Sequence, residues 1–228
     1  MVGIKKLAVT AAATMAVRRV GSVVVLVQNL QKKPGLASSL VHMYRPDVAL
    51  MQEINDSSEE PIFAAKSVSK RGYGTAIYSK DGVKDVKTVL SPHAETGGLI
   101  YKKTTIATSG SIQYVSFHGY NGQPFKSVEN LTDHVEAVLG ALDPGPAVFA
   151  GDFNTWGPEH LGAVRRALET YGFRLAVSWP YPGRNFPLDH AFVRGVKLEA
   201  SSIYDSEADH EGAILQLSLS GSGCQQID

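Results

Sequence analysis

The chain of 228 residues contains a single cysteine, Cys224, so it can form no intramolecular disulfide and no zinc site built from thiolates. Any metal ion must therefore be held by oxygen or imidazole ligands. The chain also has no formal net charge, because 22 Lys and Arg residues balance 22 Asp and Glu residues. This balance argues against a cationic protein that coats nucleic acid, since nonspecific affinity for a polyanion comes mostly from neutralising phosphates. An enzyme that acts on phosphates is not excluded.

Long apolar runs are absent as well. The first twenty residues place a weakly apolar stretch, 7–17, between the pairs Lys5-Lys6 and Arg18-Arg19, and it is too short and too polar to span a bilayer. A signal peptide has a similar order, but a clear cleavage site does not follow here. We expect residues 1–20 to form an N-terminal helix or arm, with a weak signal-like segment as the alternative. We expect a cytoplasmic monomer that does not insert into a membrane, with a periplasmic or secreted protein as the alternative.

The balanced charge is unevenly distributed along the chain. Residues 1–114 hold 15 basic and 8 acidic side chains, whereas residues 115–228 hold 7 and 14. In a phosphate enzyme, the cations would steer the substrate and the carboxylates would collect a divalent ion. Two differently solvated faces would give the same pattern.

Short apolar or β-branched runs predict more strands than helices. The expected strands are 23–27, 48–51, 74–78, 86–90, 99–101, 112–117, 147–150, 190–193, 198–203 and 213–219. Helical spacing of apolar residues predicts helices over 36–44, 128–142 and 159–171. Two packed sheets flanked by helices, a four-layer α+β sandwich, accommodate this pattern. We expect one domain over residues 21–219, followed by a flexible tail over 220–228.

An apolar strand leads into Asp152 and, two residues later, Asn154. If the backbone stays extended, both side chains point to the same side and share one cavity. The carboxylate can take a proton from water or polarise water toward a metal, and the amide can donate to a phosphate oxygen. A Gly-Asp turn with Asn capping the next segment is an equally good interpretation.

Two further strands end in polar side chains. Glu53 follows a buried strand, where it either faces solvent or binds a hard metal ion. Asn29 closes another apolar strand, a place where asparagine usually marks a turn.

His210 needs an acceptor that orients its ring if it is to act in acid or base chemistry. Asp209 is its neighbour in sequence, and adjacent residues of an extended chain point in opposite directions. Asp189, from another strand, is therefore the better partner, which leaves Asp209 free for a metal. His118 ends a strand and would bring a further donor toward a phosphate, although a lone histidine there is usually structural.

These polar groups occur in an order that resembles the endonuclease/exonuclease/phosphatase superfamily, over residues 22–219. The motifs that carry the resemblance are Gln28-Asn29, Gln52-Glu53, the segment 72–80, Phe117-His118, Gly151-Asp152-Phe153-Asn154-Thr155-Trp156, Leu188-Asp189-His190 and Asp209-His210. Each motif is weak alone, but the ordered set is specific. The resemblance implies a DNase I-like α/β/β/α sandwich of two mostly antiparallel sheets, closest to bacterial members with the Gly-Asp-Phe-Asn-Thr-Trp motif.

The resemblance also implies a role for each matching residue. Glu53 would be the principal metal ligand, with Asn29 and Asp209 beside it. Asp152 would activate the attacking water.

The remaining roles concern the phosphate. Asn154 and His118 would hold or neutralise it, and His210, oriented by Asp189, would bond it or exchange a proton. Gln31 stands where many family nucleases have Asp, which puts a second metal site in doubt.

Oxygen ligands without thiolates favour Mg²⁺, with Mn²⁺ as a substitute. We therefore predict a divalent-metal-dependent phosphoester hydrolase, a nuclease that cleaves DNA or RNA by direct attack of water. A phosphodiesterase or phosphatase for a phospholipid headgroup or small phosphorylated molecule is the alternative. A non-catalytic binding protein on the same scaffold is the third hypothesis.

Trp179 and Arg184 precede Asp189 and either border the cleft, stacking on a base or sugar, or belong to a surface loop that packs inward.

Overall fold

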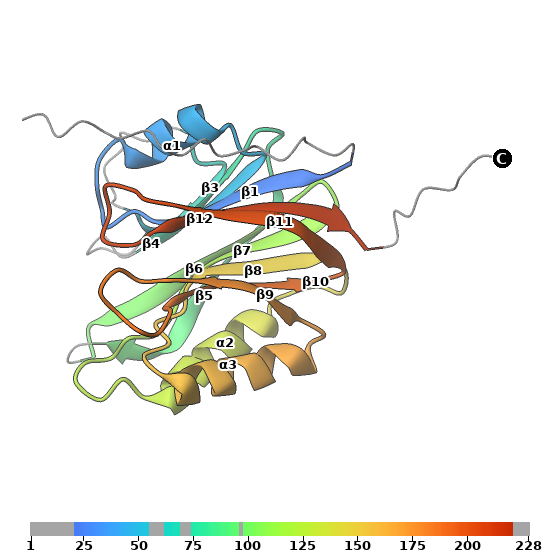
Figure 1. Cartoon of the computed structure of the whole chain (residues 1–228). Coiled ribbons are helices and arrows are strands. Elements are labelled where there is room, and N and C mark those ends of the chain that lie inside the picture. Colours follow the sequence, from blue (N-terminus) through green and yellow to red (C-terminus); the bar gives the residue numbers. More distant parts are fainter. Residues whose placement is uncertain (1–20, 55–61, 69–73, 96–97, 221–228) are drawn as a thin grey trace, which may run out of the picture.

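The computed structural model describes residues 21–54, 62–68, 74–95 and 98–220. Its strands form two six-stranded sheets (Figure 1). The first sheet has the order β11 (Val196–Tyr204), β12 (Gly212–Leu219), β1 (Val23–Asn29), β2 (Val48–Ile54), β4 (Gly74–Ser79) and β3 (Ala65–Ser67). The second has the order β5 (Lys84–Glu95), β6 (Ile100–Ser109), β7 (Ile112–His118), β8 (Ala147–Asp152), β10 (Asp189–Arg194) and β9 (Arg174–Trp179).

In the described ranges, three helices cover the outer faces of the sheets (Figure 1). Helix α1 (Leu36–Tyr44) lies on the first sheet, and α2 (Val128–Leu139) and α3 (Pro158–Thr170) lie on the second. The predicted four-layer α+β sandwich is thus confirmed. No helix in the described ranges is long and apolar enough to cross a membrane. The predictions for residues 1–20 and 221–228 lie outside the described residues.

Two strands, β3 and β9, were not predicted from the sequence, and β6 is longer than the strand expected at 99–101. Both missed strands lie at a sheet edge, where only one neighbour is hydrogen-bonded. Strand β3 has three residues, and β9 is mostly half-buried, so neither produces a strong apolar pattern.

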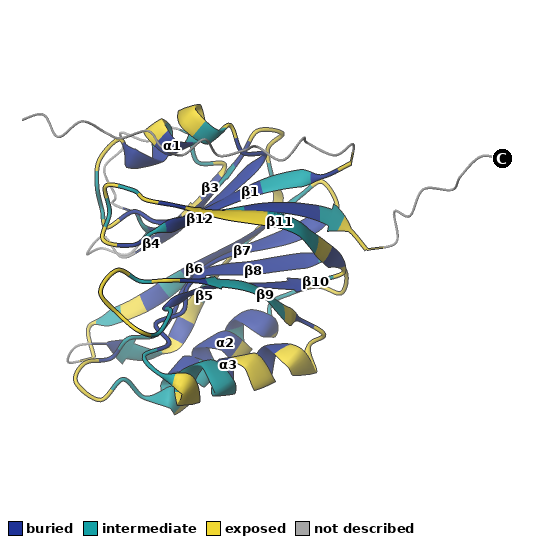
Figure 2. Cartoon of the chain, in the orientation of Figure 1, coloured by how far each residue is buried: buried dark blue, intermediate teal, exposed yellow. Residues whose placement is uncertain are grey.

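The core fills the space between the sheets and the space between the second sheet and its helices (Figure 2). Val25, Leu50, Val148 and Leu215 are among the buried residues that face each other across the sheets. Rings from β7, β8 and β10 pack beneath α2 and α3. This rigid packing fixes the strand ends that carry the polar motifs.

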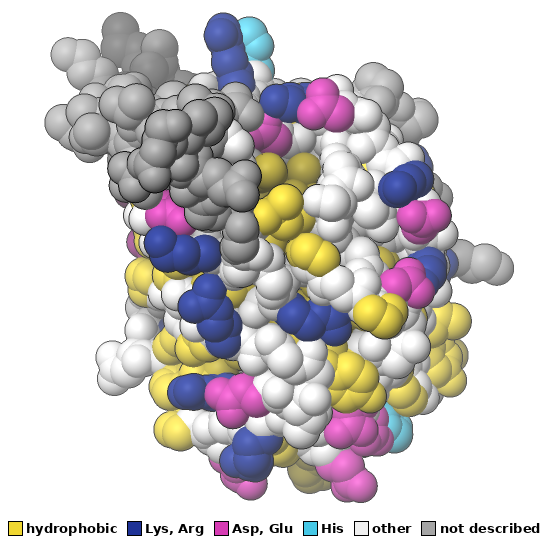
Figure 3. Space-filling model, turned by 90° about the vertical axis from the view of Figure 1, so that its right-hand side faces the viewer, with side chains coloured by type: hydrophobic (Ala, Val, Ile, Leu, Met, Phe, Trp, Pro, Cys, Tyr) yellow, Lys and Arg dark blue, Asp and Glu magenta, His cyan; other side chains and the backbone are white. Residues whose placement is uncertain are grey.

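The arrangement of parallel and antiparallel pairs explains why the motifs meet. Each sheet contains one parallel pair, β1 with β2 and β7 with β8, and all other neighbours are antiparallel. Parallel strands end at the same edge, so Asn29 lies opposite Gln52 and His118 opposite Asp152. Antiparallel β10 starts there, with Asp189 opposite Asp152. At the other end of the sandwich, Figure 3 shows Lys and Arg side chains interspersed with Asp and Glu.

One core histidine should make stability depend on pH. Burial lowers the pKa of His134 to about 3, and its Nε2 atom lies 3.2 Å from Thr104 Oγ1. The unfolded chain takes up this proton near pH 6.5, so the contribution of neutral His134 is complete above that pH and is lost as pH falls toward 3. In His134→Leu, the loss of unfolding free energy between pH 6.5 and 4.5 should shrink by about 1.4 kcal/mol per pH unit. Urea unfolding at several pH values measures this, and an unchanged slope would refute it.

Candidate active site

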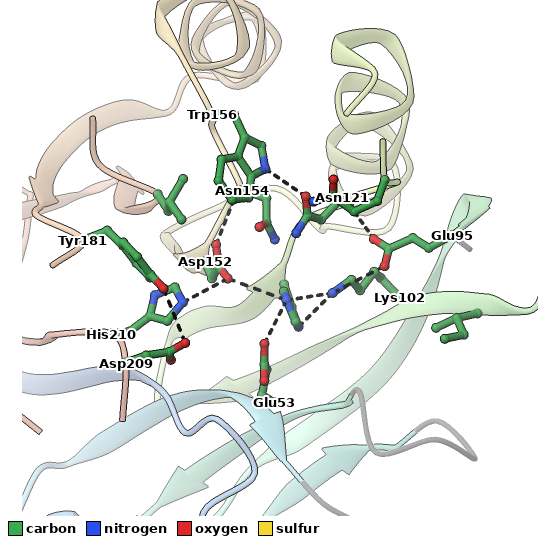
Figure 4. A pocket seen from close by; sticks show the side chains of 14 residues that line it. Glu53, Glu95, Lys102, Asn121, Asp152, Asn154, Trp156, Tyr181, Asp209 and His210 are labelled. Atoms are coloured by element: carbon green, nitrogen blue, oxygen red, sulfur yellow. Dashed lines mark hydrogen bonds and ion pairs between the residues drawn. The ribbon is translucent and has the colours of Figure 1, made fainter. Parts of the chain in front are cut away.

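A pocket of about 310 Å³ lies at the end of the sandwich where the polar motifs meet (Figure 4). Six of the predicted site residues line it: Glu53, His118, Asp152, Asn154, Asp209 and His210. Asn29 and Asp189 are buried behind the lining and contact it through hydrogen bonds. The structure therefore brings together residues that are up to 181 positions apart in the chain.

Asp152 lies at the centre of this group (Figure 4). One carboxylate oxygen accepts the backbone N–H of Asn154 at 2.9 Å, and the other accepts the Asn29 amide at 3.2 Å. That second oxygen also lies 3.6 Å from His118 Nε2 and 3.7 Å from His210 Nε2. A 2% exposed carboxylate is thus held rigidly, with two imidazoles close to one of its oxygens.

His210 is oriented by Asp189, the partner that the sequence favoured. The distance from His210 Nδ1 to Asp189 Oδ2 is 2.7 Å, and both residues are buried. Burial alone would lower the pKa of His210, but the carboxylates of Asp189 and Asp152 outweigh burial and raise this pKa above the usual value. Burial also raises the pKa of the Asp189 carboxyl. The ring is therefore held as a cation whose Nε2 side faces Asp152.

The pKa of His118 is shifted in the opposite direction to that of His210. His118 is 3% exposed, and burial together with the charge of Lys102 lowers its pKa well below the usual value. The Lys102 ammonium donates to His118 Nε2 at 2.8 Å and lies 3.8 Å from Glu95 Oε2. The lowered pKa favours an uncharged His118 ring, which can hold a phosphate through a hydrogen bond, and the role expected for His118 stays a prediction. Lys102 brings an ammonium group to this wall.

Glu53 and Asn29 lie on the first-sheet side of the pocket. Glu53 has a φ angle of 52°, a left-handed conformation that is uncommon for glutamate and that directs its carboxylate to within 3.8 Å of His118. The role of Asn29 as a metal ligand stays a prediction. The amide nitrogen of Asn29 faces Glu53 and Asp152, while its oxygen accepts the backbone N–H of Gln31 at 3.0 Å. In this orientation Asn29 is a donor that holds the two carboxylates together.

Asn154 reaches the pocket by a turn and not by an extended backbone. Strand β8 ends at Asp152, and Asn154 has a φ angle of 54°. Its side-chain nitrogen donates to the Gly119 carbonyl at 3.1 Å. The second hydrogen of this amide remains for a ligand in the pocket, since an amide nitrogen carries two donors.

The two aromatic-loop predictions have different outcomes. Trp179 is 1% exposed, belongs to the core between the sheets and donates its indole N–H to the Glu211 carbonyl. It therefore cannot stack on a ligand, and its prediction as a substrate contact is wrong. Arg184 is exposed and lies over the ring of Trp156, which does line the pocket.

Several lining residues were not identified as site residues from the sequence: Glu95, Lys102, Asn121 and Trp156. The Tyr181 ring packs against His210, with centroids 4.6 Å apart, and its hydroxyl lies 3.4 Å from Asp209 Oδ2. Trp156 ends the motif that contains Asp152, which was the available signal. The others sit in loops or on β5 and β6, where spacing gives no sign of the pocket.

The pocket offers carboxylate ligands for a hard cation. Among the described residues, no group of three His, Cys, Asp and Glu side chains is arranged to share a metal ion. Mg²⁺ binds through one or two carboxylates and keeps several waters, so it does not need such a group. Glu53 and Asp209 supply carboxylates of that kind to the pocket.

Solved structures of other proteins share this fold. An endonuclease/exonuclease/phosphatase protein from Bacteroides vulgatus matches 87% of this chain and 99% of its own, with a TM-score of 0.67 and 17% identity. D. rerio TDP2, solved with a single-stranded DNA product, matches 86% of this chain and 99% of its own, with a TM-score of 0.62 and 16% identity.

Sequence relatives cover a shorter part. A UPF0294 protein of Vibrio vulnificus is 30% identical over 127 residues, which cover 53% of this chain and 44% of that protein. The chain thus spans less than half the length of this curated relative. The model of the endonuclease/exonuclease/phosphatase family matches residues 27–210, which include all the polar groups described above. The chain therefore belongs to the endonuclease/exonuclease/phosphatase family.

Proposed function

We propose that this protein is a divalent-metal-dependent phosphoester hydrolase, a nuclease that cleaves phosphodiester bonds of DNA or RNA by direct attack of water. The observation that carries the proposal is the position of Asp152. Its carboxylate is fixed by Asn29 and by the Asn154 backbone, and it borders a pocket beside the cationic ring of His210. A fixed carboxylate of this kind can accept a proton from a water molecule as that water attacks phosphorus.

The other side chains of the pocket would bind and polarise the phosphate. His210 Nε2 can donate to a phosphate oxygen while Asp189 holds its opposite nitrogen. Asn154 adds a neutral donor, and Lys102 adds a positive charge on the opposite wall. These donors oppose the negative charge that develops on the phosphate oxygens during attack.

Glu53 and Asp209 would hold a divalent cation, Mg²⁺ or Mn²⁺. When bound, this ion would stabilise charge on the phosphate or on the leaving oxygen. Asn29, which donates to both Glu53 and Asp152, would keep these two carboxylates at a fixed separation. A nucleic-acid substrate is supported by structural neighbours such as TDP2, described with a DNA product.

The test is hydrolysis of bis-p-nitrophenyl phosphate, supercoiled plasmid, single-stranded DNA and RNA with Mg²⁺. We expect activity that EDTA removes and Mg²⁺ restores. Glu53→Gln should raise the Mg²⁺ concentration for half-maximal activity by about tenfold to a hundredfold, because a neutral amide is a weaker ligand than a carboxylate. Glu129→Gln, on the exposed face of α2, serves as the control.

An unchanged Mg²⁺ titration of Glu53→Gln would contradict the role of Glu53. Cleavage of the small ester without cleavage of any nucleic acid would replace the nuclease by a phosphodiesterase for a phospholipid headgroup or small molecule.

A further inference from the structure

Two cationic side chains lie over one indole at the mouth of the pocket. Lys126 Nζ is 2.9 Å and Arg184 Cζ is 3.9 Å from the ring centroid of Trp156. Trp156 lines the pocket, and its Nε1–H donates to Asn121 Oδ1 at 2.9 Å. The backbone N–H of Asn121 in turn donates to Glu95, another lining residue. The indole is thus fixed to the pocket wall, and cation–π contact holds both cations beside the pocket.

Arg184 also extends toward the opposite wall. Its guanidinium carbon lies 5.7 Å from the ring centroid of Tyr181, the residue that packs against His210. Figure 4 shows Trp156 and Tyr181 on two sides of Asp152. The guanidinium therefore lies near both of these rings, which line the pocket.

The two cations repel each other. Partial burial and the charge of Arg184 lower the pKa of Lys126. In the part of the chain that the structure describes, neither side chain forms an ion pair with a carboxylate. Adjacent like charges cost free energy, and an anion that contacts both side chains lowers that cost. Guanidinium and ammonium groups together are well suited to phosphate oxygens.

We propose that Lys126 and Arg184 form a site for a second phosphate of the substrate, separate from the phosphate that is hydrolysed. This inference rests on the proposed function and narrows its substrate class. The substrate would carry a further phosphate next to the scissile diester, as an internal linkage of a nucleic acid does. A small polyphosphorylated ester would offer the same chemistry.

The test compares two esters with the same leaving group: thymidine 5′-(p-nitrophenyl phosphate), and the same compound with an added 3′-phosphate. We expect wild type to prefer the 3′-phosphorylated ester by about tenfold in kcat/KM, the size of one charge-assisted contact. In Lys126→Gln/Arg184→Gln this preference should disappear, while kcat/KM for the ester without the 3′-phosphate changes by less than about twofold. Lys84→Gln/Arg166→Gln, which removes the same charge at exposed positions outside the pocket lining, should keep the preference.

Calorimetric binding of thymidine 3′,5′-bisphosphate gives a readout that needs no turnover, and the pair variant should bind it about tenfold more weakly than wild type.

Loss of single-stranded oligonucleotide cleavage in the pair variant would assign the second phosphate to a nucleic-acid chain. If the pair variant loses the preference for the 3′-phosphorylated ester but still cleaves the oligonucleotide, the second phosphate belongs to a small molecule. Equal wild-type rates on both esters, or an unchanged preference in the pair variant, would overturn the second-phosphate site alone. No hydrolysis of either ester would overturn the proposed function, and the calorimetric comparison would still decide on the site.

Discussion

Replacing Asp152 with asparagine should lower kcat for phosphodiester hydrolysis by about 10²–10⁴-fold and leave the fold intact. The asparagine oxygen can still accept the backbone N–H of Asn154, which Asp152 now accepts at 2.9 Å. The amide cannot accept a proton from water, so the chemical step loses its base. Steady-state kinetics with Mg²⁺ measures the loss, and circular dichroism measures the retention of the fold.

Asp81→Asn is the matched control for this substitution. Asp81 is an exposed carboxylate outside the catalytic pocket, and its replacement should leave kcat unchanged. Turnover of Asp152→Asn close to that of wild type would remove Asp152 from the mechanism.

Asp189→Asn should lower kcat by about a hundredfold or more, with KM within about twofold of wild type. Asp189 touches no substrate in this account. It is a positioning residue that fixes the His210 ring through Nδ1 and favours its protonated form. An asparagine at 189 would remove that charge and allow the neutral ring.

The control for Asp189 is a second Asp–His pair outside the pocket, His93 with Asp133, whose nitrogen–oxygen distance is 2.6 Å. Asp133→Asn should affect stability slightly and leave kcat unchanged. If Asp189→Asn raised KM and left kcat unchanged, Asp189 would act on binding and not on the chemical step.

Local patterns predicted the parts of the fold that depend on local forces. Helix α1 has the bounds that apolar spacing predicted, and the buried strands β1, β2 and β8 contain the expected runs. The sequence did not predict β3 and β9 because each lies at the edge of a sheet. Residues of an edge strand are partly exposed to solvent, so they need not be apolar.

The candidate site was predictable where a motif ends a strand. The pairing of His210 with Asp189 was predicted because adjacent side chains of an extended chain point in opposite directions. In the structure, His210 Nδ1 lies 2.7 Å from Asp189 Oδ2. Trp179 was misplaced because the sequence near it resembles a loop, although it ends the edge strand β9 and is buried between the sheets.

The mouth of the pocket could not be predicted in the same way. Lys126, Trp156 and Arg184 come from three separate loops, and only the folded chain brings them together. Similarly, burial and the charge of Lys102 lower the pKa of His118, and the contact between these two side chains joins the neighbouring strands β6 and β7.

The most direct test of the central claim is the stereochemistry of hydrolysis of one stereoisomer of thymidine 5′-(O-p-nitrophenyl phosphorothioate) in ¹⁸O-labelled water with Mg²⁺ present. Direct attack by a water molecule that Asp152 activates is one displacement at phosphorus, so it predicts inversion of configuration in the ¹⁸O-labelled thymidine 5′-phosphorothioate. Retention would mean two displacements, the first by a group of the enzyme, and the account of this pocket would be wrong.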